Sequence, residues 1–289
     1  MSEGPLLVTG AGGLLGQALA AQPGALGLDR AALDIIDPAA VRAALRALRP
    51  RALINAAAQA GVDRAELEPA ATFAVNDLAV GILAACCAEL GVRFVHISTD
   101  YVLRGAAAPG LLLDEGAPLG PVGVYARSKA QGEAAALAHG AVVARVQWVY
   151  AAQGRGFFAA ALRRMIAGEP LLLVPDQLGC PTPAHLLARW LCALAEGGPV
   201  GLYHLATTGE TSPADWLGAA ARLLGQDLRW TPLPRAELGP VPRPARSCLD
   251  GARARRDFGL EAVDWHAALE AELRRAGVPP LSRGPSTGG

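Results

Sequence analysis

The sequence predicts an α/β fold in which a parallel sheet is covered by helices on both faces. Short apolar runs typical of buried strands alternate with segments whose apolar residues recur at helical spacing. Repeated strand–helix–strand units form right-handed crossovers, which build a parallel sheet between two helical layers. The length of 289 residues and the hydrophobic fraction of 52% are sufficient for a large buried core.

Five strands and four helices are expected in the first half of the chain. The strand candidates are residues 5–9, 25–28, 52–55, 92–98 and 141–146. The helical patterns cover residues 14–21, 38–48, 72–90 and 125–137. Ligands bind at the carboxyl ends of parallel strands, so one edge of the sheet is expected to carry the residues near these ends: Gly10, Asp29, Asn55, Thr99 and Trp148.

The pattern loosens after about residue 150. Prolines cluster there, and long connections separate the helices that are expected at 155–167, 184–196, 212–224 and 264–276. We interpret residues 1–150 as the nucleotide-binding sheet unit and residues 151–278 mainly as a smaller, mostly helical substrate-binding region, some of whose segments return to the sheet unit. Residues 279–289 are expected to form a flexible tail.

A glycine-rich turn lies between the first strand and the first helix and reads Gly10-Ala-Gly12-Gly13-Leu14-Leu15-Gly16. Glycine permits a tight turn and a close approach of the backbone, and the N–H groups at the start of the helix can bind a pyrophosphate. Asp29 would accept a hydrogen bond from the ribose 2′-hydroxyl of NADH, whereas Arg30 would pair with the 2′-phosphate of NADPH. The pattern therefore predicts a Rossmann-like dinucleotide site and leaves both cofactors open.

A phenol and an ammonium group are expected on one face of a helix, at Tyr125 and Lys129. Lys129 is the only lysine of the chain, whose other 25 basic residues are arginines. A carbonyl group that accepts hydride also needs a proton, and a nearby ammonium lowers the pKa of a phenol that donates one. We predict Tyr125 as the proton donor, Lys129 as its partner and Thr99 as a second donor to the carbonyl oxygen. Asn76 is expected either to order water beside Lys129 or to bend the helix.

Composition argues against several other classes of protein. The formal net charge is zero, with 26 basic and 26 acidic side chains, which disfavours nucleic-acid binding. The start of the chain does not resemble a signal peptide, and apolar stretches are interrupted before they reach membrane-spanning length, so a cytoplasmic protein without a membrane partner is expected. The five cysteines and five histidines have no metal-ligand spacing, and we expect free thiols, histidines without a special role and no metal site.

Several stretches resemble the extended short-chain dehydrogenase/reductases and, within them, the dTDP-4-dehydrorhamnose reductases. The resemblance covers about residues 5–276. The glycine turn and the Tyr/Lys pair are shared by the whole superfamily. The more specific stretches are Ser98-Thr99-Asp100-Tyr101-Val102 and Asp176-Gln177-Leu-Gly179-Cys-Pro181-Thr182, and further matches start at Asn55, Val62, Trp148 and Arg243.

The resemblance implies an NADPH- or NADH-dependent reductase that converts the 4-keto group of dTDP-4-dehydro-L-rhamnose to give dTDP-L-rhamnose. It implies Thr99, Tyr125 and Lys129 as the catalytic set. The implied cofactor-binding residues are Gly10, Gly12, Gly13, Leu14, Leu15, Gly16, Asp29, Arg30, Asn55, Ala56, Ala57, Asn76, Ser98, Tyr125 and Lys129. The implied residues for the nucleotide-sugar substrate are Val62, Asp63, Thr99, Asp100, Tyr101, Trp148, Gln177, Pro181, Thr182 and Arg243.

The chain departs from the family pattern at several positions. Ala60-Gly61 and Leu103-Arg104 replace common family residues, and Gln147 stands where Ser or Thr is common before the Trp. Gln17-Ala18 replaces the neighbourhood of a Glu with which some members bind magnesium, so no such metal is expected. The remaining alternatives are another sugar-nucleotide 4-ketoreductase, a related epimerase or dehydratase, and a non-catalytic NADP-binding subunit that resembles the regulatory subunit of methionine adenosyltransferase. The sequence leaves a monomer and a homodimer open.

Overall fold

The computed structural model describes residues 4–106, 108 and 110–278, so the expected tail at 279–289 lies outside the described residues. A six-stranded parallel sheet with the order β2-β1-β3-β4-β5-β9 forms its centre. Its strands are β1 (Leu6–Thr9), β2 (Ala25–Leu28), β3 (Ala52–Asn55), β4 (Arg93–Thr99), β5 (Val142–Val146) and β9 (Gly201–Leu205). The predicted fold class is confirmed, although β9 was not expected, because it is a short strand within a region of helical patterns.

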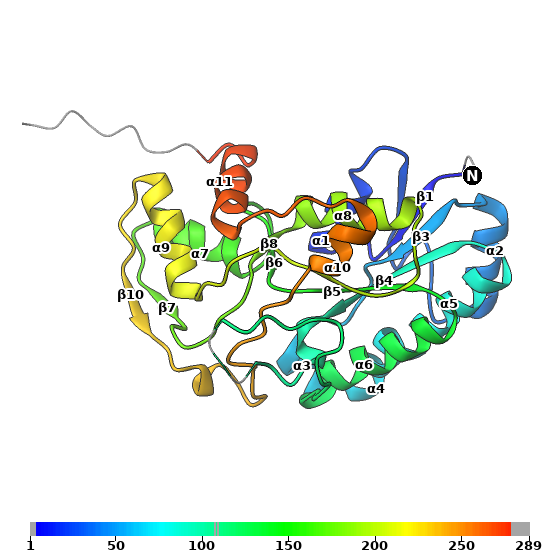
Figure 1. The fold of residues 1–289 in the computed structure, drawn as a ribbon, viewed down its shortest axis with the longest axis horizontal. Coiled ribbons are helices and arrows are strands. Elements are labelled where there is room, and N and C mark those ends of the chain that lie inside the picture. Colours follow the sequence, from blue (N-terminus) through cyan, green and yellow to red (C-terminus); the bar gives the residue numbers. More distant parts are fainter. Residues whose placement is uncertain (1–3, 107, 109, 279–289) are drawn as a thin grey trace, which may run out of the picture.

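Helices cover both faces of the sheet. The helices on one face are α1 (Leu14–Ala20) and α8 (Ala184–Glu196), and those on the other are α2 (Pro38–Leu48), α5 (Ala79–Glu89) and α6 (Gly123–Ala138). Figure 1 shows α1 and α8 above the sheet and α5 and α6 below it. Successive strand residues point to opposite faces, so Leu6 packs in the core with α1 and α8, whereas Leu7 packs in the core with α2 and α5. Strands buried on both faces explain the uninterrupted apolar runs in the sequence.

The longest predicted helix is built from three pieces. After α3 (Val62–Leu67) come α4 (Pro69–Phe73), a π-helical turn at Ala74–Leu78 and α5. This run of 21 residues contains an 18-residue window with a mean hydropathy of 1.7 and is long enough to cross a membrane, so the expectation that apolar stretches are too short was wrong. It lies inside the fold, where α5 packs against β4 and α6 and 44% of its most apolar window is buried, as in the core helix of a globular domain.

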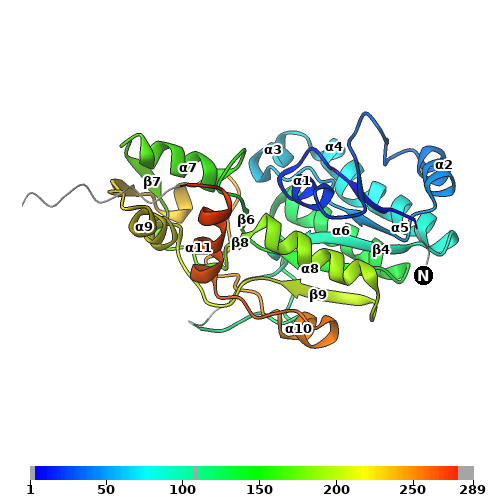
Figure 2. The same cartoon turned by 90° about the horizontal axis from the view of Figure 1, so that it is seen from above.

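The second half of the chain forms a separate core beside the sheet (Figure 2). Its elements are α7 (Phe157–Ile166), α9 (Pro213–Leu224), α11 (Trp265–Arg275) and the strand pairs β6 (Val149–Tyr150) with β8 (Thr182–Pro183) and β7 (Leu171–Leu173) with β10 (Trp230–Pro232). The sheet unit receives α8, β9 and α10 (Ala252–Phe258) from this half. We retain the division at residue 150 as a proposal, with these three elements assigned to the sheet unit.

Candidate active site

Two cavities open along the carboxyl edge of the sheet. The larger one, of about 580 Å³, lies beside the ends of β1, β2 and β3 and is called the glycine cavity here, because Gly10, Gly12 and Gly13 line it. The smaller one, of about 320 Å³, is called the aromatic pocket, because Tyr101, Trp148 and other rings line it. Tyr101 follows β4 and Trp148 follows β5, so the two cavities are neighbours along the sheet.

Two glycines of the turn are required by close packing. Gly10 has a φ of 72°, and a Cβ there would lie 2.5 Å from the Ala57 backbone nitrogen. A Cβ on Gly16 would lie 2.0 Å from the Gly10 carbonyl oxygen, so Gly16 allows α1 to approach the strand. Leu15 belongs to the core of the sheet unit. Of the predicted cofactor residues, the wall of the glycine cavity contains Gly10, Gly12, Gly13, Asp29, Arg30, Ala56 and Ala57.

Asp29 and Arg30 lie on the same cavity wall as the glycine turn. The Oδ1 atom of Asp29 accepts hydrogen bonds from the backbone N–H groups of Ala31 and Ala32, at 3.0 and 2.9 Å. These bonds hold the carboxylate at the end of β2 and leave Oδ2 for another partner. Sequence reasoning missed Arg64 and Glu68, an exposed ion pair that also lines this cavity.

The predicted proton donor lies at the end of β4. The Tyr125 phenol lies near the Thr99 hydroxyl, and its ring packs edge-on against Tyr101 at 5.8 Å between centroids. Burial raises the pKa of Tyr125 above its ordinary value, and the nearby Thr99 hydroxyl opposes this only in part. The phenol therefore holds its proton firmly, contrary to the expectation of a lowered pKa.

Lys129 is buried at 2% exposure beneath the same strand end. Its Nζ donates to the Ile97 carbonyl oxygen at 2.6 Å and lies 3.2 Å from His96 Nε2. Burial lowers the pKa of Lys129 to about 8. The hydrogen bonds of this lysine are thus made with β4, which explains why burial dominates the pKa of Tyr125. His96 was expected to have no special role, although a histidine inside the apolar strand Phe94-Val95-His96-Ile97 was a usable signal.

Three other predicted cofactor residues are buried behind the cavity wall. Asn55 is fully buried, and its Oδ1 accepts from the N–H of Ala57. Asn76 lies in the π-helical turn, and its amide binds both the N–H and the C=O of Gln59 and donates to Ser128 Oγ. Asn76 thus ties the loop that contains Gln59 to α6. This structural role is closer to the predicted helix-bending role than to the predicted ordering of water. Ser98 is buried, and its Oγ has no hydrogen-bond partner among the described residues.

Asp100, a predicted substrate residue, instead anchors a chain segment. Its Oδ2 accepts from Ser247 Oγ at 2.6 Å and from Gln147 Nε2 at 3.1 Å. Gln147 also accepts from the Cys180 N–H, so this departure from the family pattern joins three segments. Burial raises the pKa of Asp100 to about 6, although the hydrogen bonds with Ser247, Gln147 and Thr99 lower it. A carboxylate at 2% exposure that is occupied in this way is unsuited to direct substrate contact.

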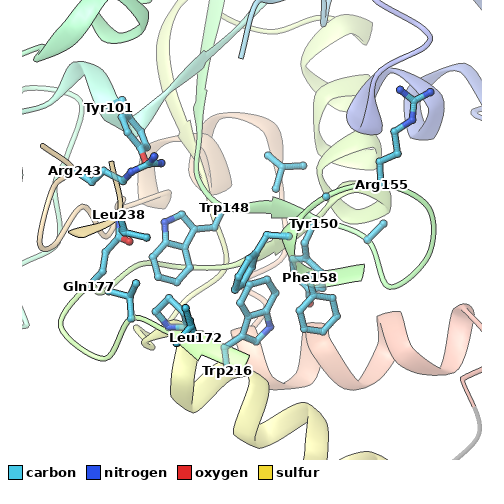
Figure 3. Close-up of a pocket in the computed structure, with 16 residues that line it drawn as sticks. Tyr101, Trp148, Tyr150, Arg155, Phe158, Leu172, Gln177, Trp216, Leu238 and Arg243 are labelled. Atoms are coloured by element: carbon cyan, nitrogen blue, oxygen red, sulfur yellow. The ribbon is translucent and has the colours of Figure 1, made fainter. Parts of the chain in front are cut away.

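The aromatic pocket brings together residues from distant parts of the chain. Of the predicted substrate residues, it contains Tyr101, Trp148, Gln177 and Arg243. Figure 3 shows Tyr101 and Arg243 side by side at one end, the rings of Trp148, Tyr150, Phe158 and Trp216 in the middle, and Arg155 at the far end. The wall residues that sequence reasoning missed include Tyr150, Arg155, Phe157, Phe158, Leu172, Pro213, Trp216 and Leu238.

Trp148 has a backbone conformation that is rare for a bulky residue, with a φ of 40°. Its indole lies against Gly179, where a Cβ would be only 2.6 Å from the ring. The backbone N–H of Thr182 donates to the Trp148 carbonyl oxygen at 3.2 Å, which holds the turn in place. Strain of this kind persists where the surroundings fix it, and here it aims the indole into the pocket.

Arg243 links the aromatic pocket to the first turn of α3. Its Nη2 donates to Asp63 Oδ2 at 3.0 Å, and its guanidinium lies beside the Tyr101 phenol (Figure 3). Arg243 Nε and Asp63 Oδ1 are buried and have no hydrogen-bond partner among the described residues. Buried polar atoms of this kind are normally satisfied, so these two atoms are suited to a polar ligand.

The other predicted substrate residues lie away from the pocket surface. Thr182 is fully buried behind the wall, where its hydroxyl donates to the Cys180 carbonyl oxygen. Pro181 is also buried, and its carbonyl oxygen accepts from Thr207 Oγ1. Val62 begins α3, beside Asp63. Pro181 and Thr182 therefore brace Trp148 and Gly179, and their contact with the substrate stays a prediction.

Comparison with known proteins identifies the family. The family described as RmlD substrate binding domain has a model that matches residues 4–277. The chain belongs to this family. It is 39% identical to the dTDP-4-dehydrorhamnose reductase of Mycobacterium tuberculosis strain H37Rv, with 93% of this chain and 92% of the relative covered, and 35% identical to that of Burkholderia thailandensis, with 91% and 96% covered.

Solved structures support the same membership. The dTDP-4-dehydrorhamnose reductase from Bacillus anthracis, solved in complex with NADP, superposes with a TM-score of 0.89 at 26% identity and covers 95% of this chain and 100% of its own. The resemblance to dTDP-4-dehydrorhamnose reductases that the motifs indicated is therefore confirmed, and the family places the chain among NAD(P)H-dependent oxidoreductases.

Proposed function

We propose that this chain reduces the 4-keto group of dTDP-4-dehydro-L-rhamnose to give dTDP-L-rhamnose, with hydride from NADPH or NADH. The observation that carries the proposal is the placement of Thr99 and Tyr125 at the end of β4, where Thr99 ends the strand and the Tyr125 ring packs edge-on against Tyr101 of the aromatic pocket. This strand end lies between β3, which borders the glycine cavity, and β5, which leads into the aromatic pocket. Two hydroxyl donors at the junction of a cofactor site and a substrate site suit the reduction of a carbonyl group.

The residues of the glycine cavity fit a dinucleotide. Gly12 and Gly13 carry no side chain into the cavity, and the packing at Gly10 leaves no room for one. The backbone at Gly10 and Gly13 would therefore allow a pyrophosphate to approach closely. Asp29 would take the ribose hydroxyls through its available oxygen, and Arg30 would take a 2′-phosphate. The bound nicotinamide would supply the hydride. The complex of the Bacillus anthracis relative with NADP supports this assignment.

The chain's own groups would handle the proton. The raised pKa of Tyr125 keeps the phenol protonated, so it is ready to donate to an oxygen that becomes negative. Thr99 Oγ1 would hold the same oxygen beside the phenol. The charge of Lys129, one helical turn away, would stabilise the phenolate that remains. Arg243 would bind a polar part of the nucleotide sugar through its available Nε, and the rings of the aromatic pocket would cover its apolar faces.

The proposal is tested by incubating the purified protein with dTDP-4-dehydro-L-rhamnose and each reduced cofactor while the nicotinamide absorbance is followed. We expect one equivalent of cofactor to be oxidised per sugar reduced. An epimerase or dehydratase would recycle its cofactor, so sugar conversion without net oxidation would refute the reductase assignment. Tyr125→Phe serves as the matched control, and unchanged biological function in that variant would favour the non-catalytic NADP-binding alternative.

We further propose that the enzyme works in the cytoplasm as a monomer or homodimer, without a membrane or nucleic-acid partner. The zero formal net charge and the packing of α5 against β4 and α6 support this placement.

A further inference from the structure

A row of buried polar side chains crosses the sheet beneath the proposed active site. Thr9, Asn55 and His96 are register neighbours on β1, β3 and β4, so their side chains share one face of the sheet, the face that α6 covers. Thr9 Oγ1 lies 2.7 Å from Asn55 Oδ1, Asn55 Nδ2 lies 3.2 Å from His96 Nδ1, and His96 Nε2 lies 3.2 Å from Lys129 Nζ. None of the four residues is more than 2% exposed.

The orientation of the Asn55 amide is determined by its neighbours. The backbone N–H of Ala57 donates to Asn55 Oδ1 at 3.1 Å, and the Thr9 hydroxyl donates to the same oxygen. A flipped amide would place its NH₂ group against the Ala57 N–H, which would leave two donors facing each other. The NH₂ group of Asn55 therefore points to His96, and His96 Nδ1 must accept.

This arrangement selects one form of the His96 ring. A neutral imidazole has one donor and one acceptor nitrogen, so acceptance at Nδ1 places the proton on Nε2. The Nε2–H group then faces Lys129 Nζ. An ammonium group has three donors and no acceptor, whereas a neutral amine has a lone pair that accepts this hydrogen bond. As an amine, Lys129 still donates to the Ile97 carbonyl oxygen at 2.6 Å.

The other groups around His96 and Lys129 leave the ammonium and amine forms of Lys129 close in free energy. Glu133, one turn further along α6, favours the ammonium form of Lys129. Its carboxylate is, however, bound on both oxygens by Arg145 of β5, at 2.8 and 2.7 Å. Tyr125, one turn before Lys129 on α6, is neutral, and the ring of Phe94 on β4 stacks at 6.4 Å from that of His96. Burial lowers the pKa of both His96 and Lys129, in the same direction as the hydrogen-bond argument.

We propose that Asn55 and His96 are positioning residues that set the charge of Lys129, because the imidazole presents an N–H to Nζ and favours the neutral amine. The proposal rests on the proposed function only in that Lys129 is expected to act on Tyr125. A lysine that is held near its point of half-protonation changes charge readily within the range in which an enzyme works. An ordinary lysine, with a pKa near 10.5, would stay charged throughout.

The single lysine of the chain makes a direct test possible. Protein labelled with ¹³C at lysine Cε, and purified with a tag that contains no lysine, gives one resonance, which reports Lys129 alone. We expect a titration midpoint of about 8, well below that of a free lysine. In His96→Gln, whose amide oxygen can face Nζ as an acceptor, the midpoint should rise by roughly one pH unit or more. An unchanged or lower midpoint in this variant would overturn the proposal.

A second measurement needs no substitution at the site. Spectra of ¹⁵N-histidine protein distinguish the two imidazole tautomers, and we expect a neutral His96 ring with its proton on Nε2 near pH 7. A proton on Nδ1, or a charged ring, would reject the proposed arrangement even if His96→Gln does not fold. His139→Gln is the matched control, since this exposed histidine should leave the Lys129 midpoint where it is.

The pH dependence of steady-state kinetics distinguishes this proposal from the reductase assignment. If Lys129 acts through its charge, the alkaline limb of kcat should move to higher pH in His96→Gln, whereas KM for the nucleotide sugar should stay within a few-fold. A failure of the Tyr125→Phe prediction would remove the proposed reaction, but the two spectroscopic readouts involve no turnover and would stand or fall independently.

Discussion

The two halves of the site are built in different ways. The glycine cavity is formed largely by residues that directly follow β1, β2 and β3, and each of them is placed by its own strand. The aromatic pocket collects side chains from five segments between Tyr101 and Arg243, and no single element determines its shape. This comparison shows that the cofactor site at the sheet edge is determined locally, by the ends of the strands. The substrate site depends instead on how the second core packs beside the sheet.

The largest effect is expected at the boundary between the two halves. Tyr125→Phe removes the proton donor and should lower kcat by roughly 10²- to 10⁴-fold. Because neither cavity loses wall area, KM for both substrates should stay within a few-fold, as steady-state kinetics would measure. A melting temperature equal to that of the parent protein would exclude misfolding. Near-parental turnover would mean that another group donates the proton.

The buried Asp100 should make the substrate half sensitive to pH. Its folded-state pKa of about 6 lies above its ordinary value of 3.8, so between these pH values the folded protein binds more protons than the unfolded chain. The free energy of unfolding should therefore fall as pH rises from about 4 to about 6, by roughly 3 kcal/mol for this group alone.

Asp100→Asn tests that contribution, because an amide can keep the hydrogen bonds from Ser247 and Gln147 without a charge. Denaturant unfolding at pH 4 and pH 7 should show a smaller loss of stability on raising the pH in this variant than in the parent. An identical pH dependence in both proteins would show that the Asp100 carboxyl is not the group responsible.

Arg243→Ala should act on the substrate half only. Loss of the guanidinium removes the partner of Asp63 and the available Nε, so KM for the nucleotide sugar should rise by roughly 10- to 100-fold, the usual range for a charged hydrogen bond. KM for the cofactor should change little. Arg189→Ala is a suitable control, since Arg189 lies on α8 and forms an exposed ion pair with Glu261. Equal changes in both KM values would argue that the halves are coupled.

The smallest effect is expected from Gly179→Ala. The new methyl group would press on the Trp148 indole, which can give way because it borders a cavity, so the loss of stability should be on the order of 1 kcal/mol. Thermal unfolding should also show that Trp148→Phe, with its smaller ring, suppresses this loss in the double variant. Additive losses would mean that the two residues do not contact each other as described.

Local patterns in the sequence were sufficient for most of the sheet unit. The strands β1 to β5, the glycine turn and the spacing of Tyr125 and Lys129 could be predicted because strand and helix periodicity, glycine sterics and the i,i+4 relation are properties of short segments. The specific motifs then led to the correct family. Asp29, Tyr101, Trp148 and Arg243 were also placed on cavity walls as expected.

Only the tertiary structure decided which polar groups meet in the interior. Neither His96 in its apolar strand nor Gln147 beside Trp148 had a predicted partner, and their partners Asn55, Lys129, Asp100 and Ser247 come from distant segments. The same cause explains the unexpected strand β9, the buried Asp100 and Thr182, and a Tyr125 whose pKa is raised. Burial and hydrogen bonding across the fold depend on the positions of all the packed elements, which periodicity in one segment does not specify.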